Sequence, residues 1–296
     1  DRGLVGSEMC IRDRNVSAIK HCNFSGVVDG INSSGGIAVP MLLEKLNVDV
    51  KKINCTPNGI FTHNPEPLKE NLTELCDVVK KNKSNFGIAV DPDVDRLVFV
   101  DERGEMFGEE YTLVACSDYV LSKSPGSIVS NLSSSRALPD LAKQYGVNHF
   151  TSAVGEFHVV EKMKAVKAVI GGEGNGGVIY PKLHYGRDAL VGIALFLSLL
   201  AEKKLSISAL KNKYTNYVMR KTKINLNNDI KVDLILKKIA KKFENFNISE
   251  SDGVKVDFED SWIHLRKSNT EPIIRLYAEG KELSLIHISE PTRPLS

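Results

Sequence analysis

The segment Phe86-Gly-Ile-Ala-Val-Asp-Pro-Asp-Val-Asp-Arg-Leu-Val-Phe-Val100 decides how this chain folds. Two short apolar runs flank its centre, and each has the length and composition of a buried strand. Between them, Asp91, Asp93 and Asp95 alternate along an extended segment. Alternating residues of an extended segment point to one side, so these three carboxylates can converge on one cation at the strand end. Carboxylate oxygens suit Mg²⁺, which prefers octahedral oxygen coordination, so the segment predicts a magnesium site.

Three other interpretations of this acidic segment remain open. An EF-hand loop also begins with alternating acids, and Glu102 would supply its last ligand, but Arg96 stands where that loop needs a sharply turning glycine. Phosphatases of the haloacid dehalogenase type place Asp-x-Asp after a strand and use the first aspartate, here Asp91, as nucleophile. A solvated acidic turn is the third alternative. Arg96 could support the site by holding a carboxylate or a phosphate with two parallel hydrogen bonds.

The surrounding pattern predicts an α/β fold with two consecutive α/β domains that have mixed sheets, followed by a small α+β C-terminal domain. We place the three domains at 15–115, 116–215 and 216–282. Strands are expected to end at 29 and to span 48–53, 86–90, 97–100, 127–131, 149–151, 168–170, 178–180, 254–258, 262–266 and 273–278. Helices are expected at 37–46, 68–81, 109–121, 136–145, 157–165, 189–202 and 230–244.

Both ends of the chain differ from the rest. Residues 1–14 and 283–296 have no clean periodicity and no targeting pattern. Both resemble translated sequencing-adapter read-through, so we treat them as artefactual tails. We therefore expect the chain to be a gene fragment that is cut at both ends.

Composition excludes several classes of partner. The 296 residues carry a net charge of only +2, which favours neither nucleic acid nor a membrane. The lysine-rich stretch 203–242 is interpreted as a solvated helical face. The longest apolar run, 189–201, is shorter than the ~20 residues that span a bilayer and predicts a buried helix. Five scattered cysteines without zinc-type spacing indicate a reducing, cytoplasmic location.

A second polar segment, Arg266-Lys-Ser-Asn-Thr-Glu-Pro-Ile-Ile-Arg275, connects two predicted strands. Ser268, Asn269 and Thr270 offer hydroxyl, amide and backbone N–H donors. Arginines stand at the ends of the two strands and can bind a phosphate with paired hydrogen bonds. The segment therefore predicts a phosphate cradle between two strands, with a polar surface hairpin as the alternative.

A third segment, Gly171-Gly-Glu-Gly-Asn-Gly-Gly177, is interpreted as a flexible loop. It matches no nucleotide-binding pattern. Glycines allow the backbone to approach a ligand closely, and Glu173 and Asn175 can accept from and donate to sugar hydroxyls. Taken alone, a structural turn is the favoured interpretation.

His184, Arg187 and Asp188 precede the predicted buried helix. Asp188 has the position and the side chain of a helix N-cap. For His184 and Arg187, a structural role and a contact with the sugar or its phosphate are both open.

The three segments, in this order, resemble those of the α-D-phosphohexomutase superfamily, which includes the phosphoglucosamine, phosphomannose and phosphoglucose mutases. The resemblance extends over about residues 27–279. It implies a four-domain parent protein whose first domain, with the catalytic phosphoserine, is missing from this chain. It further implies that Asp91, Asp93 and Asp95 bind Mg²⁺ and that Glu173 and Asn175 meet the sugar hydroxyls. The implied ligands of the non-reacting phosphate are Arg266, Ser268, Asn269, Thr270 and Arg275.

The function implied by the resemblance is interconversion of hexose 6-phosphate and hexose 1-phosphate through a phosphoserine and a bisphosphate intermediate, with hexose 1,6-bisphosphate as primer. The Glu-Gly-Asn-Gly-Gly variant most resembles a subgroup usually assigned phosphoglucosamine mutase. Many members have serine and then histidine where this chain has Asn175 and Gly177. The alternatives are a phosphomannomutase or phosphoglucomutase, a dehalogenase-type sugar phosphatase, and a non-catalytic phosphosugar-binding module. We expect the fragment alone to be inactive because it lacks the serine domain.

Overall fold

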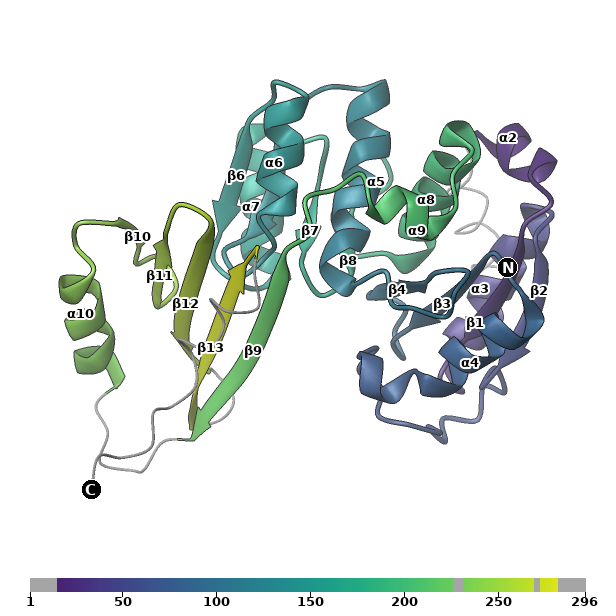
Figure 1. Cartoon of the computed structure of the whole chain (residues 1–296), viewed down its shortest axis with the longest axis horizontal. Coiled ribbons are helices and arrows are strands. Elements are labelled where there is room, and N and C mark those ends of the chain that lie inside the picture. The colour runs from purple at the N-terminus through teal and green to yellow at the C-terminus, as the bar shows by residue number, and fades with distance from the viewer. Residues whose placement is uncertain (1–14, 226–231, 269–271, 282–296) are drawn as a thin grey trace.

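The computed structural model describes residues 15–225, 232–268 and 272–281. They form three sheet-containing units that follow one another in a row (Figure 1). The N-terminal unit lies at one end and the C-terminal unit at the other, so the middle unit contacts both.

The first unit contains strands β1 (Ser25–Asp29), β2 (Asp49–Ile53), β3 (Phe86–Val90) and β4 (Leu97–Val100). The sheet order is β2-β1-β3-β4, with β4 antiparallel to β3 and the other pairs parallel. The carboxyl ends of β1 and β3 therefore lie side by side, and the acidic segment begins at this edge. The helices of this unit are α2 (Val16–His21), α3 (Gly35–Lys45), the short η1 (Lys69–Asn71) and α4 (Thr73–Asn82).

The second unit repeats this plan with β5 (Ile128–Asn131), β6 (His149–Ser152), β7 (Ile170–Glu173) and β8 (Gly177–Ile179). Its order is β6-β5-β7-β8, and again only the last strand is antiparallel. The helices are α5 (Glu109–Lys123), α6 (Ala137–Gln144), α7 (Glu156–Val166), α8 (Ala189–Lys203) and α9 (Ile207–Lys211).

The third unit is an antiparallel sheet in the order β10-β11-β12-β13-β9. Its elements are β9 (Val218–Asn225), α10 (Val232–Lys242), β10 (Asn247–Ser249), β11 (Val254–Asp257), β12 (Ser261–Lys267) and β13 (Ile273–Gly280). Two mixed α/β sheets followed by a sheet-rich unit confirm the predicted fold class. Helix α5 continues through residues 115 and 116, where the sequence places a domain boundary, so the predicted boundaries stay predictions.

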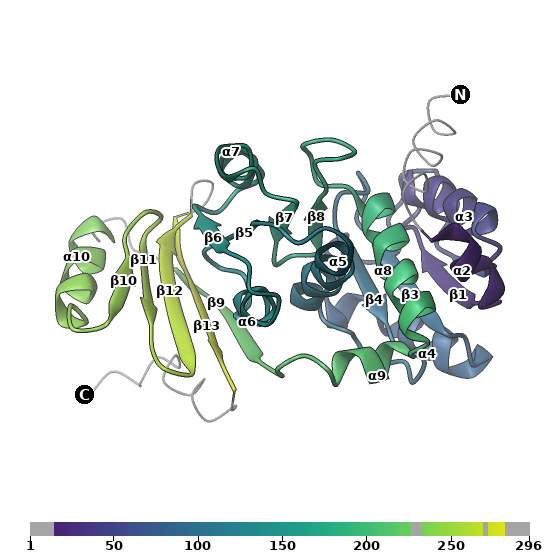
Figure 2. The same cartoon turned by 90° about the horizontal axis from the view of Figure 1, so that it is seen from above.

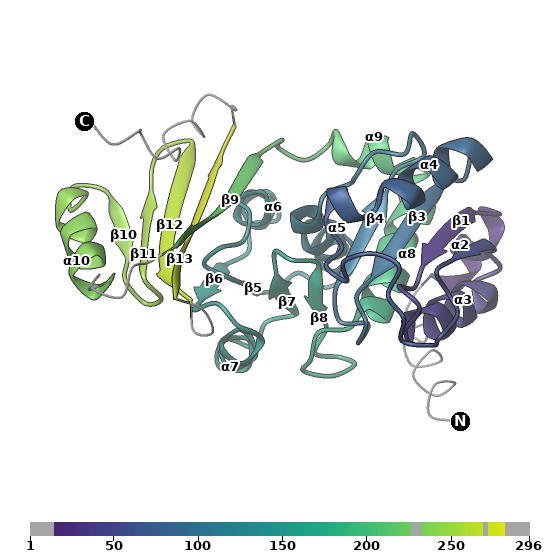
Figure 3. The ribbon, with the colours of Figure 1, turned by 90° about the horizontal axis from the view of Figure 1, so that it is seen from below.

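Helices α5 and α8 lie between the two α/β sheets, as the views from above and below show (Figures 2 and 3). Helix α8 contacts α5 and β8 of its own unit and α2, α3 and β4 of the first unit. The rings of Phe99 in β4 and Phe196 in α8 stack with their centroids 3.8 Å apart. A helix that is packed on several sides is apolar all round, which explains the long apolar run and confirms the predicted buried helix.

Several predicted elements need correction. The predicted helix 68–81 is interrupted at Leu72, whose φ of −111° is not helical and whose side chain is buried. The predicted strand 168–170 instead begins at Ile170 and continues into the glycine-rich segment. Helices α2 and α9 and strand β10 were not predicted, because so few residues give no recognisable periodicity.

Some predictions fall wholly or partly outside the described residues. They include the two tails and the first two residues of the predicted helix 230–244. Within the described part of the chain, no helix combines the length and the apolar composition needed to cross a bilayer.

We predict that Phe196→Ala lowers the free energy of unfolding by about 3–5 kcal/mol, because it leaves a cavity between the first two units. Urea denaturation followed by circular dichroism measures this change. Phe157→Ala is the matched control, because Phe157 is 71 % exposed, and it should change the free energy by less than about 0.5 kcal/mol. Equal effects of the two substitutions would contradict the packing described here.

Candidate functional site

The acidic segment folds back on itself directly after β3. Val94 has a φ of +61°, a left-handed conformation that is rare for a β-branched residue. This turn lets the backbone N–H groups of Asp95 and Arg96 both donate to Asp91 Oδ1, each at 3.0 Å. Carboxylate oxygens of Asp91, Asp93 and Asp95 all lie within 4.8 Å of one another. The geometry is therefore suited to three carboxylates around one cation.

The charges in this segment are only partly compensated. Arg96 Nε donates to Asp91 Oδ2 at 2.6 Å, and although burial opposes it, hydrogen bonds from Arg96 lower the pKa of Asp91. Burial and the neighbouring Asp91 raise the pKa of Asp95 to about 7. Asp95 Oδ1 is buried and accepts no hydrogen bond from any described residue. A buried carboxylate oxygen without a partner is costly, and a bound cation would satisfy it.

The glycine-rich segment is a tight hairpin, which is the structural turn favoured for this segment when it is taken alone. Its first three residues belong to β7 and its last to β8, so Gly174, Asn175 and Gly176 form the turn. A Cβ at Gly174 would lie 1.8 Å from Glu110 Oε2, and one at Gly176, where φ is +88°, would lie 2.4 Å from the Leu97 carbonyl oxygen. The glycines are therefore needed for close packing. Leu97 N also donates to Gly176 O at 3.1 Å, which fixes the hairpin against the acidic segment.

Glu173 is held in one orientation at the end of β7. Its Oε1 accepts from Asn131 Nδ2 at 2.8 Å and from Gly155 N at 3.0 Å. Its Oε2 pairs with Arg187 Nη1 at 3.1 Å. The turn residue Asn175 accepts from Gly177 N at 3.2 Å through its side-chain oxygen, which orients its amide.

Arg187 binds three carboxylates, and His184 binds one. The Arg187 guanidinium contacts Asp95, Glu156 and Glu173. His184 is half exposed and lies 2.9 Å from Asp188 Oδ2, and this hydrogen bond raises the histidine pKa. The predicted N-cap is confirmed, because Asp188 Oδ1 accepts from Val191 N at 3.0 Å.

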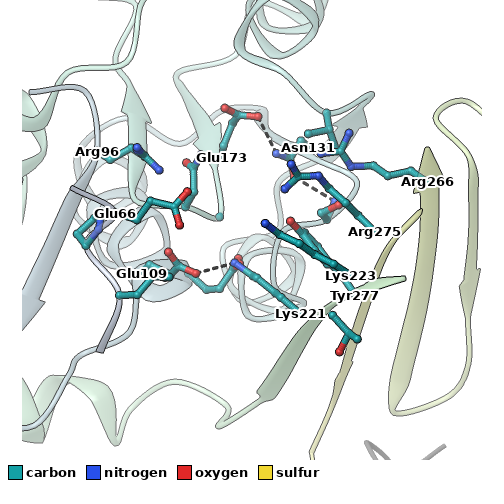
Figure 4. Close-up of a pocket in the computed structure, with 18 residues that line it drawn as sticks. Glu66, Arg96, Glu109, Asn131, Glu173, Lys221, Lys223, Arg266, Arg275 and Tyr277 are labelled. Carbon is teal, nitrogen blue, oxygen red and sulfur yellow. Dashed lines mark hydrogen bonds and ion pairs between the residues drawn. The ribbon is translucent and has the colours of Figure 1, made fainter. Parts of the chain in front are cut away.

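A cavity of about 590 Å³ lies where the three units meet (Figure 4). Arg96 lines it and binds Asp91, so the acidic segment borders the cavity. The cavity lining includes five residues predicted from the sequence, Arg96, Glu173, Asn175, Arg266 and Arg275. The three aspartates, His184, Arg187 and Ser268 are not among its lining residues. The complete lining is Glu66, Pro67, Leu68, Arg96, Glu109, Glu110, Asn131, Ser133, Val154, Glu173, Gly174, Asn175, Lys221, Thr222, Lys223, Arg266, Arg275 and Tyr277.

The third unit contributes a row of three cations to this cavity. Arg266 on β12 pairs in register with Arg275 on β13, which pairs with Lys223 on β9. We call these three residues the cationic row. Like charges on directly opposite strand positions repel one another, so an anion bound to the cationic row would reduce this repulsion. Arg266 Nε is also buried and has no hydrogen-bond partner among the described residues. The predicted phosphate ligands Asn269 and Thr270 lie outside the described residues.

The sequence analysis predicted Glu173 but missed Glu66, Glu109, Lys221 and Lys223 of the cavity lining. Figure 4 shows Glu66, Glu109 and Glu173 facing the basic side chains of the third unit. The interpretation of 203–242 as a solvated helical face is wrong for Lys221 and Lys223, which lie on strand β9. Their spacing of two residues was the available signal, because it places both side chains on one face of a strand.

Polar contacts join the second and third units next to the cavity. Ser133 Oγ lies 2.8 Å from His264 Nδ1, and His264 Nε2 lies 2.6 Å from the Asp252 carbonyl oxygen. A carbonyl can only accept, so Nε2 carries the proton and Ser133 donates to Nδ1. Burial also lowers the pKa of His264, so the ring is neutral. Arg136 N donates to Glu279 Oε2 at 2.8 Å in the same interface.

Lys221 adds an ionic contact between the same two units. Its Nζ lies 2.6 Å from Glu109 Oε1 and 3.0 Å from Glu110 Oε1. Glu110 Oε2 accepts from Ser135 N at 3.0 Å. Burial raises the pKa of Glu110 to about 8, although the charge of Lys221 opposes this shift.

Comparisons with known proteins place the chain in one group. Family models of phosphoglucomutase/phosphomannomutase match residues 8–104 as α/β/α domain II, 108–217 as α/β/α domain III and 220–287 as the C-terminal domain. A relative from Thermococcus kodakarensis named phosphoglucomutase/phosphomannomutase is 36 % identical, over 90 % of this chain and 59 % of the relative. A phosphoglucosamine/phosphogalactosamine mutase from Sulfurisphaera tokodaii is 32 % identical, over 90 % of this chain and 60 % of that protein.

A solved structure of a phosphoglucomutase/phosphomannomutase family protein from Burkholderia thailandensis has a TM-score of 0.86 at 27 % identity. The match covers 97 % of this chain and 62 % of that one. The chain thus spans about three fifths of the length of the curated relatives named here.

The buried Glu110 gives a pH-dependent prediction. Its pKa in the folded protein, about 8, is above the ordinary value of 4.5. An acid with a raised folded pKa stabilises the fold below its unfolded pKa, and this contribution is lost as the pH rises through the folded pKa. The free energy of unfolding of the Glu110→Gln chain, relative to that of the unsubstituted chain, should therefore increase as the pH rises from about 5 to about 9.

Urea unfolding at these two pH values measures the change. The same substitution at the exposed Glu161 is the control and should produce no such trend. A difference between Glu110→Gln and the unsubstituted chain that does not depend on pH would contradict the prediction.

Proposed function

Since the chain belongs to the phosphoglucomutase/phosphomannomutase family, we propose that the whole protein is a Mg²⁺-dependent phosphohexomutase that interconverts hexose 6-phosphate and hexose 1-phosphate. The observation that carries this proposal is the cavity between the three units, in which an acidic side faces the cationic row. A phosphosugar has a polyol that can donate to carboxylates and a phosphate that binds cations, so it suits both sides.

Asp91, Asp93 and Asp95 would hold the Mg²⁺. Their oxygens are close enough to share one ion, and the buried Asp95 Oδ1 has no hydrogen bond from a described residue. When bound, Mg²⁺ would offset negative charge on the phosphoryl group that is transferred. Arg96 supports the site by fixing Asp91 through one backbone and one side-chain hydrogen bond.

The cationic row would bind the phosphate that does not react. The phosphate ligands in this proposal are Arg266, Arg275 and Lys223. Resemblance to the family implies three further ligands, Ser268, Asn269 and Thr270. An anion held at one end of the cavity positions the other end of the ligand. Its binding energy can then be used to lower the barrier to phosphoryl transfer.

Glu173 and Asn175 would bind the sugar hydroxyls. Both side chains line the cavity and are oriented by hydrogen bonds, so they need little rearrangement when a ligand enters. His184 stays a predicted substrate contact, and its half-exposed ring is held by Asp188. In this proposal, the nucleophilic serine lies in a domain other than the three that match this chain.

Glucosamine phosphate is the substrate we propose first. The Glu-Gly-Asn-Gly-Gly variant supports it, and so does the name of the relative from Sulfurisphaera tokodaii. Mannose or glucose phosphate is the second candidate, because the relative from Thermococcus kodakarensis is named phosphoglucomutase/phosphomannomutase.

The test is a mutase assay on the full-length protein with Mg²⁺ and a hexose 1,6-bisphosphate primer. We expect conversion of glucosamine 6-phosphate, and a loss of about 10²–10³-fold in kcat on Asp93→Ala, as is usual when electrostatic stabilisation of a transition state is removed. Asp77→Ala, an exposed aspartate in the same unit, should leave activity unchanged. Release of inorganic phosphate with covalent labelling of Asp91 would instead support the dehalogenase-type phosphatase.

The cationic row gives a prediction for the chain itself. Lys223→Met should raise the free energy of unfolding by a few tenths to about 1 kcal/mol without ligand, because it removes a like charge opposite Arg275. The same substitution should weaken binding of glucosamine 6-phosphate in calorimetry.

Lys238→Met, on the exposed face of α10, is the control and should change neither quantity. A Lys223→Met chain that is less stable without ligand, or that binds the phosphosugar as tightly as before, would contradict the role of the row.

A further inference from the structure

Arg187 connects three carboxylates that come from three different places in the fold. One of its terminal nitrogens contacts Asp95 Oδ2 in the acidic segment. The other lies 3.1 Å from Glu173 Oε2 at the end of β7, and Nε lies 3.0 Å from Glu156 Oε2 at the start of α7. A planar guanidinium with donors in a fixed fork can bind several carboxylates at once, which the ammonium of a lysine cannot do with the same geometry.

The backbone at Arg187 is fixed on both sides. Arg187 forms a β-bridge with Ile179 next to the hairpin. Asp188 N donates to Val178 O at 2.9 Å, and Ala189 N donates to Val94 O at 3.0 Å. The acidic segment and the hairpin are therefore both tied to the start of α8, and the arginine has little freedom to turn away.

The Arg187 side chain lies directly on the hairpin. A Cβ at Gly177 would come within 2.4 Å of Arg187 Cδ, so the glycine is what leaves room for the arginine. The side chain is only 20 % exposed. Its charge therefore acts on Asp95 and Glu173 with less screening than a surface charge would.

Arg96 Nε lies 3.9 Å from Asp95 Oδ1, too far for a hydrogen bond, so Arg187 is the cation that is hydrogen-bonded to Asp95. Asp95 Oδ2 is bound by Arg187, while its Oδ1 is buried and accepts no hydrogen bond from the described residues. A divalent cation at the three aspartates would stand close to the guanidinium and repel it. The cation and Arg187 therefore compete for Asp95, whereas Arg187 stays paired with Glu173, which Asn131 and Gly155 also hold in place.

We propose that Arg187 is a positioning residue that couples the metal site to the sugar-binding hairpin. It pairs with Asp95 while the metal site is empty, and it holds Glu173 in place for the sugar in either state. This coupling rests on the proposed function, because it needs a divalent cation at the aspartates and a phosphosugar in the cavity. It differs from the sequence-based expectation, in which Arg187 contacts the sugar or phosphate directly.

The coupling has consequences of opposite sign for the two ligands. Arg187→Met removes a competing positive charge, so binding of a divalent cation should become tighter. The same substitution leaves Glu173 and Glu156 without their shared cation, so binding of the phosphosugar should become weaker. We expect each change to be roughly 5- to 100-fold, the range of typical coupling between two sites. A residue with a merely structural role would weaken both.

The experiment is calorimetry on this chain with Mn²⁺ alone and with glucosamine 6-phosphate alone. Arg187→Met is compared with Arg103→Met, which removes the same charge from an exposed side chain that pairs with the buried Asp101 beyond the far end of β4. The expected result is tighter Mn²⁺ binding and weaker phosphosugar binding for Arg187→Met only. Arg187→Lys keeps the charge without the fork, so it should bind Mn²⁺ within about 2-fold of the unsubstituted chain but bind the phosphosugar more weakly.

The outcomes separate this inference from the proposed function. Unchanged or weaker Mn²⁺ binding by a folded Arg187→Met chain would overturn the coupling alone. If Arg187→Met does not fold, Arg187→Lys decides, because unchanged phosphosugar binding by that variant would overturn the positioning role. Failure of the unsubstituted chain to take up Mn²⁺ would overturn the proposed metal site and the coupling together.

Discussion

Compensation of clustered charge is the constraint on which the rest of this structure depends. Carboxylates gather at the ends of β3 and β7, and cations gather across three strands of the C-terminal sheet. Neither group is stable alone, because like charges repel at short range. Within the described residues, Arg96 and Arg187 offset part of the negative charge. The cationic row faces the cavity, which makes an anionic ligand its natural counterpart.

The two junctions between units are built differently, and this difference suits the cavity they enclose. The first two units share one apolar core, in which Phe99 of one stacks on Phe196 of the other. The third unit is joined through hydrogen bonds and ion pairs, among them those of Ser133 with His264 and of Lys221 with Glu109. Polar interfaces within a chain are the kind that permit domain movement. The acidic side is therefore anchored in an apolar core, whereas the unit that carries the cationic row is joined by polar contacts, some of them buried.

Sequence reasoning could predict what depends on local patterns. The acidic segment, the strands on either side of it and the buried helix α8 follow from alternation and apolar runs, so they were found. The turn in the glycine segment was predicted, but the contacts of its glycines with Glu110 and Leu97 were not, because these residues are distant in sequence. Lys223 was missed for the same reason, since its place in the row exists only once β9 pairs with β13. The roles of the predicted ligands remain proposals.

A crystal structure of this chain with Mn²⁺ and glucosamine 6-phosphate tests the central claim most directly. Anomalous scattering locates the metal independently of the rest of the electron density. The account predicts Mn²⁺ among the oxygens of Asp91, Asp93 and Asp95, and the phosphate on the cationic row with the sugar toward Glu173. A phosphate bound elsewhere in the presence of an ordered cationic row, or a metal away from the three aspartates, would contradict it.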